Sequence, residues 1–90
     1  MIKIEDVRAV INEIDCPEDK LKEKLIAAYD GYQYNGETEV IVSRDESLDS
    51  DELQAYRTYI NKEGSPAIVA MVRQGLDHYV TTVEEAYILK

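Results

Sequence analysis

The sequence has no tryptophan and no phenylalanine, and its 90 residues include one cysteine and one histidine. The single cysteine, Cys16, excludes an internal disulfide and favours a reducing compartment. All apolar runs are shorter than the ~18 residues that a membrane helix needs. Residues 1–6 already contain acidic side chains, which are not typical of a secretory signal peptide. These features predict a cytoplasmic protein.

Basic residues are scarce as well, with 10 Lys and Arg against 19 Asp and Glu, which gives a net charge of −9. Such a charge repels nucleic-acid phosphates and anionic membranes, so we expect no direct nucleic-acid binding and no membrane binding. The same field attracts basic proteins and raises their encounter rate. The expected partner is therefore a basic protein, and a nucleic-acid-binding protein is one candidate.

All seven aromatic residues are tyrosines. A buried tyrosine needs a hydrogen-bond partner for its hydroxyl, so we expect these rings at the edge of the core or on the surface. A chain of this length is predicted to form one domain, residues 1–90, with a single modest core. Aliphatic side chains should fill most of that core.

The N-terminal third predicts two helices. Ile4, Val7, Ile11 and Ile14 recur every three or four residues, which indicates a helix over residues 4–14. Pro17 interrupts the pattern and is suited to begin a second helix, which should end near Asp30. We therefore expect an N-terminal helical hairpin.

The middle of the chain predicts a β-hairpin. Asn35-Gly36 is a strong signal for a two-residue turn between Tyr32–Tyr34 and a strand over residues 37–44. After it, Asp49 or Ser50 can cap a third helix that ends near Lys62.

The C-terminal third is ambiguous at one place. Residues 66–74 favour a short helix, although their apolar run also suits a buried strand. Residues 78–81 predict a strand, and Thr82 with Glu85 has the spacing of a capping box before a short terminal helix. The expected fold class is α+β, with the helical hairpin, a small antiparallel sheet built on the Asn-Gly hairpin, and two or three further short helices.

The sequence contains no motif for catalysis, cofactor binding or metal binding, so we expect a protein that is not an enzyme and has no cofactor. Asp45, Ser47, Asp49 and Asp51 match the first ligand positions of a calcium loop, but a serine and a tyrosine replace the required glycine and glutamate. His78 is interpreted as a structural histidine. Cys16 is interpreted as a buried or capping residue.

Residues 45–52, called the acidic segment below, hold five carboxylates. Carboxylates on a rigid frame can occupy the basic groove of a nucleic-acid-binding protein, and tyrosines add rigid contact area. The alternative interpretation is a solvated charged face with tyrosines in edge packing. The predicted partner-binding residues are Asp45, Glu46, Asp49, Asp51, Glu52, Glu37, Glu39, Tyr32 and Tyr34.

A short, acidic, tyrosine-rich and cysteine-poor chain resembles phage-encoded inhibitors in composition, including anti-CRISPR proteins and DNA mimics. The resemblance implies a non-enzymatic acidic protein that inhibits or regulates a basic, nucleic-acid-handling partner. A second hypothesis is an accessory or oligomerising protein that docks through its N-terminal helical hairpin. Both a monomer and a homodimer are compatible with the sequence.

Overall fold

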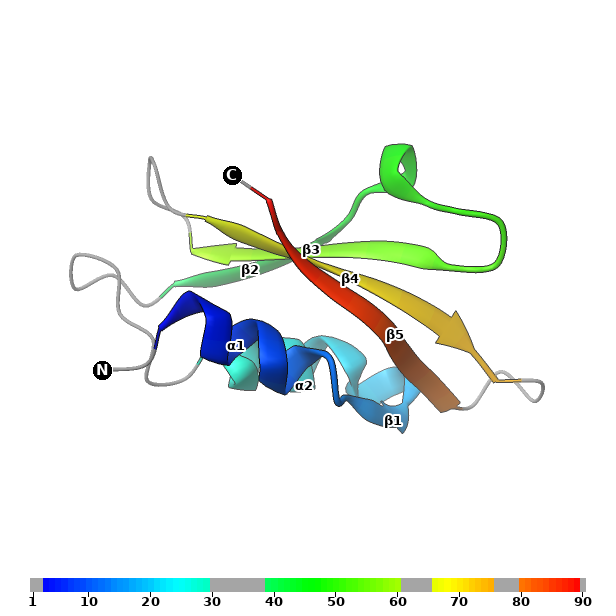
Figure 1. Ribbon diagram of the computed structural model, residues 1–90. Helices are drawn as coiled ribbons and strands as arrows, with labels where there is room; N and C mark the ends of the chain where they lie inside the picture. The colour runs from blue at the N-terminus through cyan, green and yellow to red at the C-terminus, as the bar shows by residue number, and fades with distance from the viewer. Residues whose placement is uncertain (1–2, 30–38, 61–65, 76–79, 90) are drawn as a thin grey trace.

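The computed structural model describes residues 3–29, 39–60, 66–75 and 80–89, and these residues form two short helices and one antiparallel sheet (Figure 1). The strands lie in the order β1-β5-β4-β3-β2. The elements are α1 (Ile4–Ile11), β1 (Asp15–Pro17), the 3-10 turn η1 (Glu18–Lys20), α2 (Leu21–Ala28), β2 (Val40–Arg44), the 3-10 turn η2 (Glu46–Leu48), β3 (Gln54–Ile60), β4 (Ala67–Gln74) and β5 (Val80–Leu89).

The predicted N-terminal helical hairpin is wrong, although both helices exist in shorter form. After α1 ends, the carbonyl of Ile14 accepts a hydrogen bond from the main-chain N–H of Val83 at 3.0 Å. The chain then pairs with β5 as β1, in which Pro17 lies opposite Val80. A proline is tolerated there because β1 is at the edge of the sheet and need not donate on both sides. A strand therefore separates the two helices, and neither α1 nor α2 has the length and apolar character needed to cross a membrane.

The predicted third helix is also wrong, because residues 54–60 form β3 between β2 and β4. Ala55 is buried on one face of the sheet, while Thr58 and Ile60 are buried on the other. Burial on both faces removes the simple alternation by which a half-exposed strand is recognised. The acidic residues expected to cap a helix instead lie in η2 and in the turn that an isolated bridge between Ser50 and Leu53 closes.

The expectation of a helix over residues 66–74 is wrong, and the alternative of a buried strand is confirmed as β4. The expected strand at 78–81 is confirmed from Val80 onward, but it continues to Leu89 in place of the terminal helix. The register of β5 with β4 shifts between Met71 and Val72, so that Glu84 has no residue directly opposite it on β4. Pairing with β4 along almost its whole length outweighs the capping-box spacing of Thr82 and Glu85.

The two helices cover one face of the sheet, called the inner face (Figure 1). The main core lies between the helices and this face. Tyr29 is only 2% exposed there, and its hydroxyl donates to the main-chain carbonyl of Thr58 at 2.8 Å. The expectation that tyrosines stay outside the core is therefore wrong for Tyr29, because its hydroxyl finds an acceptor. The predicted Asn35-Gly36 hairpin and His78 lie outside the described residues.

Candidate functional site

The acidic segment connects β2 to β3 and lies on the outer face of the sheet, opposite the helices (Figure 1). Two leucines anchor it. Leu48 and Leu53 pack against a small buried cluster formed by Ala55, Val69 and Met71. The segment therefore has a hydrophobic attachment of its own, separate from the main core.

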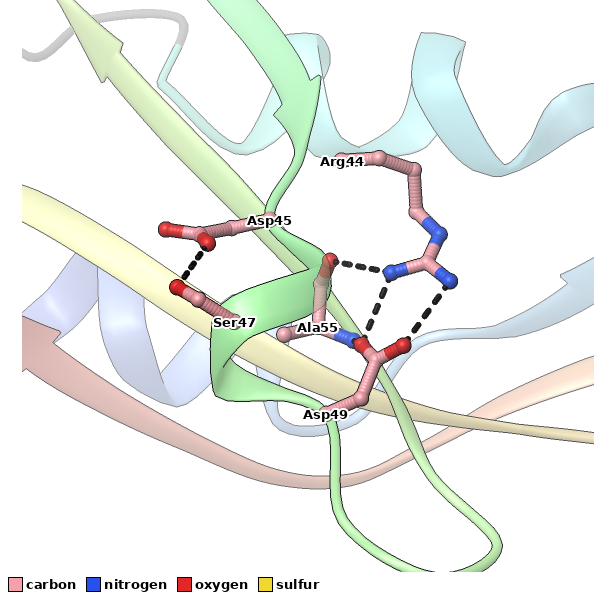
Figure 2. A network of polar contacts seen from close by, with 5 residues as sticks. All are labelled: Arg44, Asp45, Ser47, Asp49 and Ala55. Carbon is pink, nitrogen blue, oxygen red and sulfur yellow. Dashed lines mark hydrogen bonds and ion pairs between the residues drawn. The ribbon is translucent and has the colours of Figure 1, made fainter.

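Asp49 fixes the conformation of the acidic segment (Figure 2). Its carboxylate accepts hydrogen bonds from Nη1 of Arg44 at 2.8 Å, from Nη2 of Arg44 at 3.0 Å and from the main-chain N–H of Ala55 at 2.7 Å. The Arg44 guanidinium, followed by the Ala55 N–H, lowers the pKa of Asp49, and the bond to Asp49 raises the pKa of Arg44. Arg44 also donates to the carbonyl of Ala55 and lies 5.4 Å from the ring centre of Tyr56. Asp49 thus joins the segment to the start of β3.

Two further carboxylates of the acidic segment pair with arginines of the sheet. Asp45 accepts a hydrogen bond from Nη2 of Arg57 at 2.6 Å, and its side chain is only 19% exposed. Glu52 lies 2.7 Å from Nη1 of Arg73, and its side chain is 75% exposed. Arg73 also contacts Glu84 at 3.0 Å. Asp45 is therefore turned toward the sheet, whereas Glu52 still presents its charge to solvent.

The remaining predicted carboxylates are exposed. Glu46, Asp51 and Glu39 make no ion pair within residues 3–29, 39–60, 66–75 and 80–89. Five carboxylates and three guanidinium groups leave the acidic segment and its arginines with two net negative charges. The five carboxylates lie together in the structure. Arginines of the sheet pair with three of them, which the sequence did not predict.

Sequence reasoning did not find the role of Arg44, Arg57 and Arg73. They lie on three neighbouring strands, β2, β3 and β4, and only the strand order brings them around one segment. Ser43 and Arg57 are opposite in the register of β2 and β3, which places Arg57 beside Asp45. A correct assignment of β3 as a strand would have been needed to see this.

The other predicted partner-binding residues, Tyr32, Tyr34 and Glu37, lie outside the described residues. Cys16 is buried, and its Sγ lies 3.9 Å from the hydroxyl of Thr81. In the described part of the chain, no three His, Cys, Asp or Glu side chains gather in a way that could hold a metal ion. Next to the acidic segment there is an open hollow of about 430 Å³ lined by residues 50–53 and Arg73.

The second hypothesis, docking through an N-terminal helical hairpin, loses its basis because the hairpin is replaced by two helices that a strand separates. Five of their apolar residues are buried in the main core: Val7, Ile11, Leu21, Leu25 and Ala28. Val10 on α1 and Ile26 on α2 are the exposed ones among the large hydrophobic residues of these helices.

No protein-family model matches the chain, and comparisons with curated proteins and with solved structures find no match.

Proposed function

We propose that this chain is a non-enzymatic binding protein that inhibits or regulates a basic, nucleic-acid-handling partner through its acidic segment. The observation that carries the proposal is the anchoring of the segment by Asp49 and by two leucines. A carboxylate on a fixed loop loses less conformational entropy on binding than one on a mobile chain. The exposed carboxylates of the segment are thus suited to bind cations of a partner.

The carboxylates divide into two roles in this proposal. Asp45 and Asp49 hold the segment in place through their arginines. Glu46, Asp51 and Glu52 are the exposed groups, and they would accept charge-assisted hydrogen bonds from arginine or lysine side chains. Such side chains line the phosphate-binding grooves of proteins that handle nucleic acids, which supports this partner class. A cytoplasmic location is part of the proposal, and the presence of a single cysteine in the sequence supports it.

The test begins with capture of partners from the native host at low salt and their elution by salt. The association rate of a purified partner is then measured for the wild type and for the double variant Glu46→Gln, Asp51→Asn. We expect the rate to fall about tenfold at low ionic strength and by much less at high ionic strength, because electrostatic steering is screened by salt.

A matched control removes two charges from the other side of the molecule. Glu13 and Asp19 are exposed and follow α1 and β1, so Glu13→Gln, Asp19→Asn makes the same change of net charge. The control variant should associate nearly as fast as the wild type. Equal rates for both double variants would show that only the net charge matters, and the proposal for the acidic segment would then be wrong.

A further inference from the structure

The strand β2 has one side that faces away from the sheet. The main-chain N–H of Asp45 donates to the carbonyl of Ala55 at 3.0 Å, which continues the register of β2 with β3. In an antiparallel strand, successive residues direct their N–H and C=O groups to alternate sides. The main-chain groups of Val40, Val42 and Arg44 therefore point away from β3.

Within the described residues, this side of β2 is an open edge. β2 is the last strand in the sheet order, and no strand in the described part of the chain pairs with its outer side. A row of unpaired main-chain donors and acceptors is a template for an additional strand. The edge is five residues long.

The opposite edge of the sheet is less suited to accept a strand. β1 is three residues long and ends in Pro17, which cannot donate. Beyond β1, the register of β5 is irregular at Glu84, which Glu85 follows, and Ala86 is only 5% exposed. Bulges, charges and covering elements are the devices that protect strand edges. Of the two edges, β2 is therefore the one open to pairing.

The charges around β2 favour one occupant. Exposed Glu39 precedes the strand, and exposed Glu46 follows it. Between them, the half-buried side chains of Val40 and Val42 flank an incoming strand on the inner face. An extended segment with apolar or β-branched residues in its middle and a basic residue at each end fits this arrangement.

A second copy of this chain fits the edge poorly. If two β2 strands paired antiparallel about Val42, Glu39 would lie opposite Asp45 of the other copy. Like charges directly opposite each other destabilise a strand pair. Each copy also carries a net charge of −9, which opposes association.

We infer that the edge of β2 accepts an extended basic segment of the partner as an additional strand of the sheet. The inference rests on the proposed function and specifies how the partner is recognised. The carboxylates at the ends of β2 attract and align the segment. The main chain of Val40, Val42 and Arg44 binds it.

The test uses a synthetic peptide, Lys-Val-Thr-Val-Thr-Val-Lys with blocked termini, titrated into the full isotope-labelled chain at about 20 mM salt, where screening is weak. We expect saturable changes of the amide NMR signals of Val40, Val42 and Arg44. Methylation of the backbone nitrogens on the pairing side of the peptide should weaken binding about tenfold, since it removes hydrogen bonds but keeps both charges.

A protein variant tests the same edge from the other side. Val42→Pro removes an N–H that does not take part in the pairing with β3, so the sheet should remain folded, which circular dichroism can verify. It should weaken peptide binding about tenfold, whereas Val42→Ala, which keeps the N–H, should weaken it much less. If Val42→Pro unfolds the chain, the methylated peptide decides the question alone.

The outcomes separate this inference from the proposed function. Equal binding of the parent and the methylated peptides would overturn the edge inference and leave recognition by charge in place. A neutral-pH dimer that Val42→Pro abolishes would also overturn it, because a second copy would then be the occupant. Absence of peptide binding at low salt would overturn the edge inference, while the rates of the Glu46→Gln, Asp51→Asn variant would still test the acidic segment.

Discussion

At the scale of single residues, two buried threonines on the sheet differ in one hydrogen bond. Thr58 is 0% exposed and Thr81 is 1% exposed. The hydroxyl of Thr81 donates to the carbonyl of Cys16 at 3.1 Å, whereas the hydroxyl of Thr58 has no hydrogen-bond partner among the residues that the structure describes. A buried polar group without a partner costs free energy, and one with a partner contributes to stability.

Replacing each threonine with valine should therefore have opposite effects. Thr58→Val should raise the free energy of unfolding by about 1 kcal/mol, because valine has nearly the same shape and no hydroxyl to leave unpaired. Thr81→Val should lower it by about 1 kcal/mol, because the bond to Cys16 is lost. Urea unfolding of both variants measures the difference. If both variants were destabilised equally, the Thr58 hydroxyl would have a hydrogen-bond partner in solution.

At the scale of elements, the acidic segment is attached to the sheet by a small hydrophobic cluster that is distinct from the main core. Contacts of this kind permit local opening at a lower free energy than global unfolding. The hydrogen bond from the Ala55 N–H to Asp49 lies at the point of attachment, so the exchange of that amide hydrogen reports on the segment.

Leu53→Ala should loosen the segment while the sheet remains folded. Leu53 is only partly buried, so the loss should be about 1–2 kcal/mol, which is less than the 2–5 kcal/mol typical of a fully buried leucine. Hydrogen exchange should accelerate at Ala55 before the rest of the sheet. Leu25→Ala, in the main core, is the control and should accelerate exchange throughout the sheet. If Leu53→Ala had the same pattern as Leu25→Ala, the segment and the sheet would unfold as one unit.

At the scale of the whole molecule, negative charge is distributed beyond the acidic segment. Within the described residues, the helical part from Lys3 to Tyr29 and the strand β5 each carry two net negative charges, as does the segment with its arginines. Self-repulsion at a net charge of −9 destabilises the compact state at neutral pH. Repulsion declines as the pH approaches the isoelectric point of about 4.4.

The pH dependence of stability should therefore have a maximum in the mildly acidic range. From neutral pH to about pH 5, the melting temperature should rise because repulsion weakens, and added salt should flatten this rise. The pKa of Asp49 is lower in the folded chain than the usual value of about 3.9. Its contribution to stability is thus complete above that value and is lost as the pH falls through the lowered pKa. The melting temperature should fall below about pH 4.

The variant Asp49→Asn tests whether Asp49 causes the fall of the melting temperature below about pH 4. It should have a lower melting temperature at neutral pH and a shallower decline below about pH 4, because the pair with Arg44 is already lost. Glu13→Gln is the control, and its decline should match that of the wild type. If the melting temperature of Asp49→Asn fell as steeply below about pH 4 as that of the wild type, groups other than Asp49 would cause the fall.

The accuracy of sequence reasoning here depends on whether an element is determined locally. Apolar spacing predicts helices over residues 4–14 and from Pro17 to about Asp30, and both exist in shorter form as α1 and α2. Two local capping signals, at Asp49 and at Thr82, predicted helices. The chain instead forms a turn and the strand β3 after Asp49, and the strand β5 around Thr82. A helix cap contributes about 1 kcal/mol, which the pairing and burial of long strands exceed.

The sequence by itself determined the composition of this protein: its charge, its lone cysteine, its mostly aliphatic interior and the clustering of five carboxylates in residues 45–52. Only the tertiary structure decided which of these carboxylates are paired and which are exposed. The physical reason is that Arg44, Arg57 and Arg73 reach the acidic segment from three adjacent strands. Strand order depends on contacts between residues far apart in the chain, and local patterns do not contain that information.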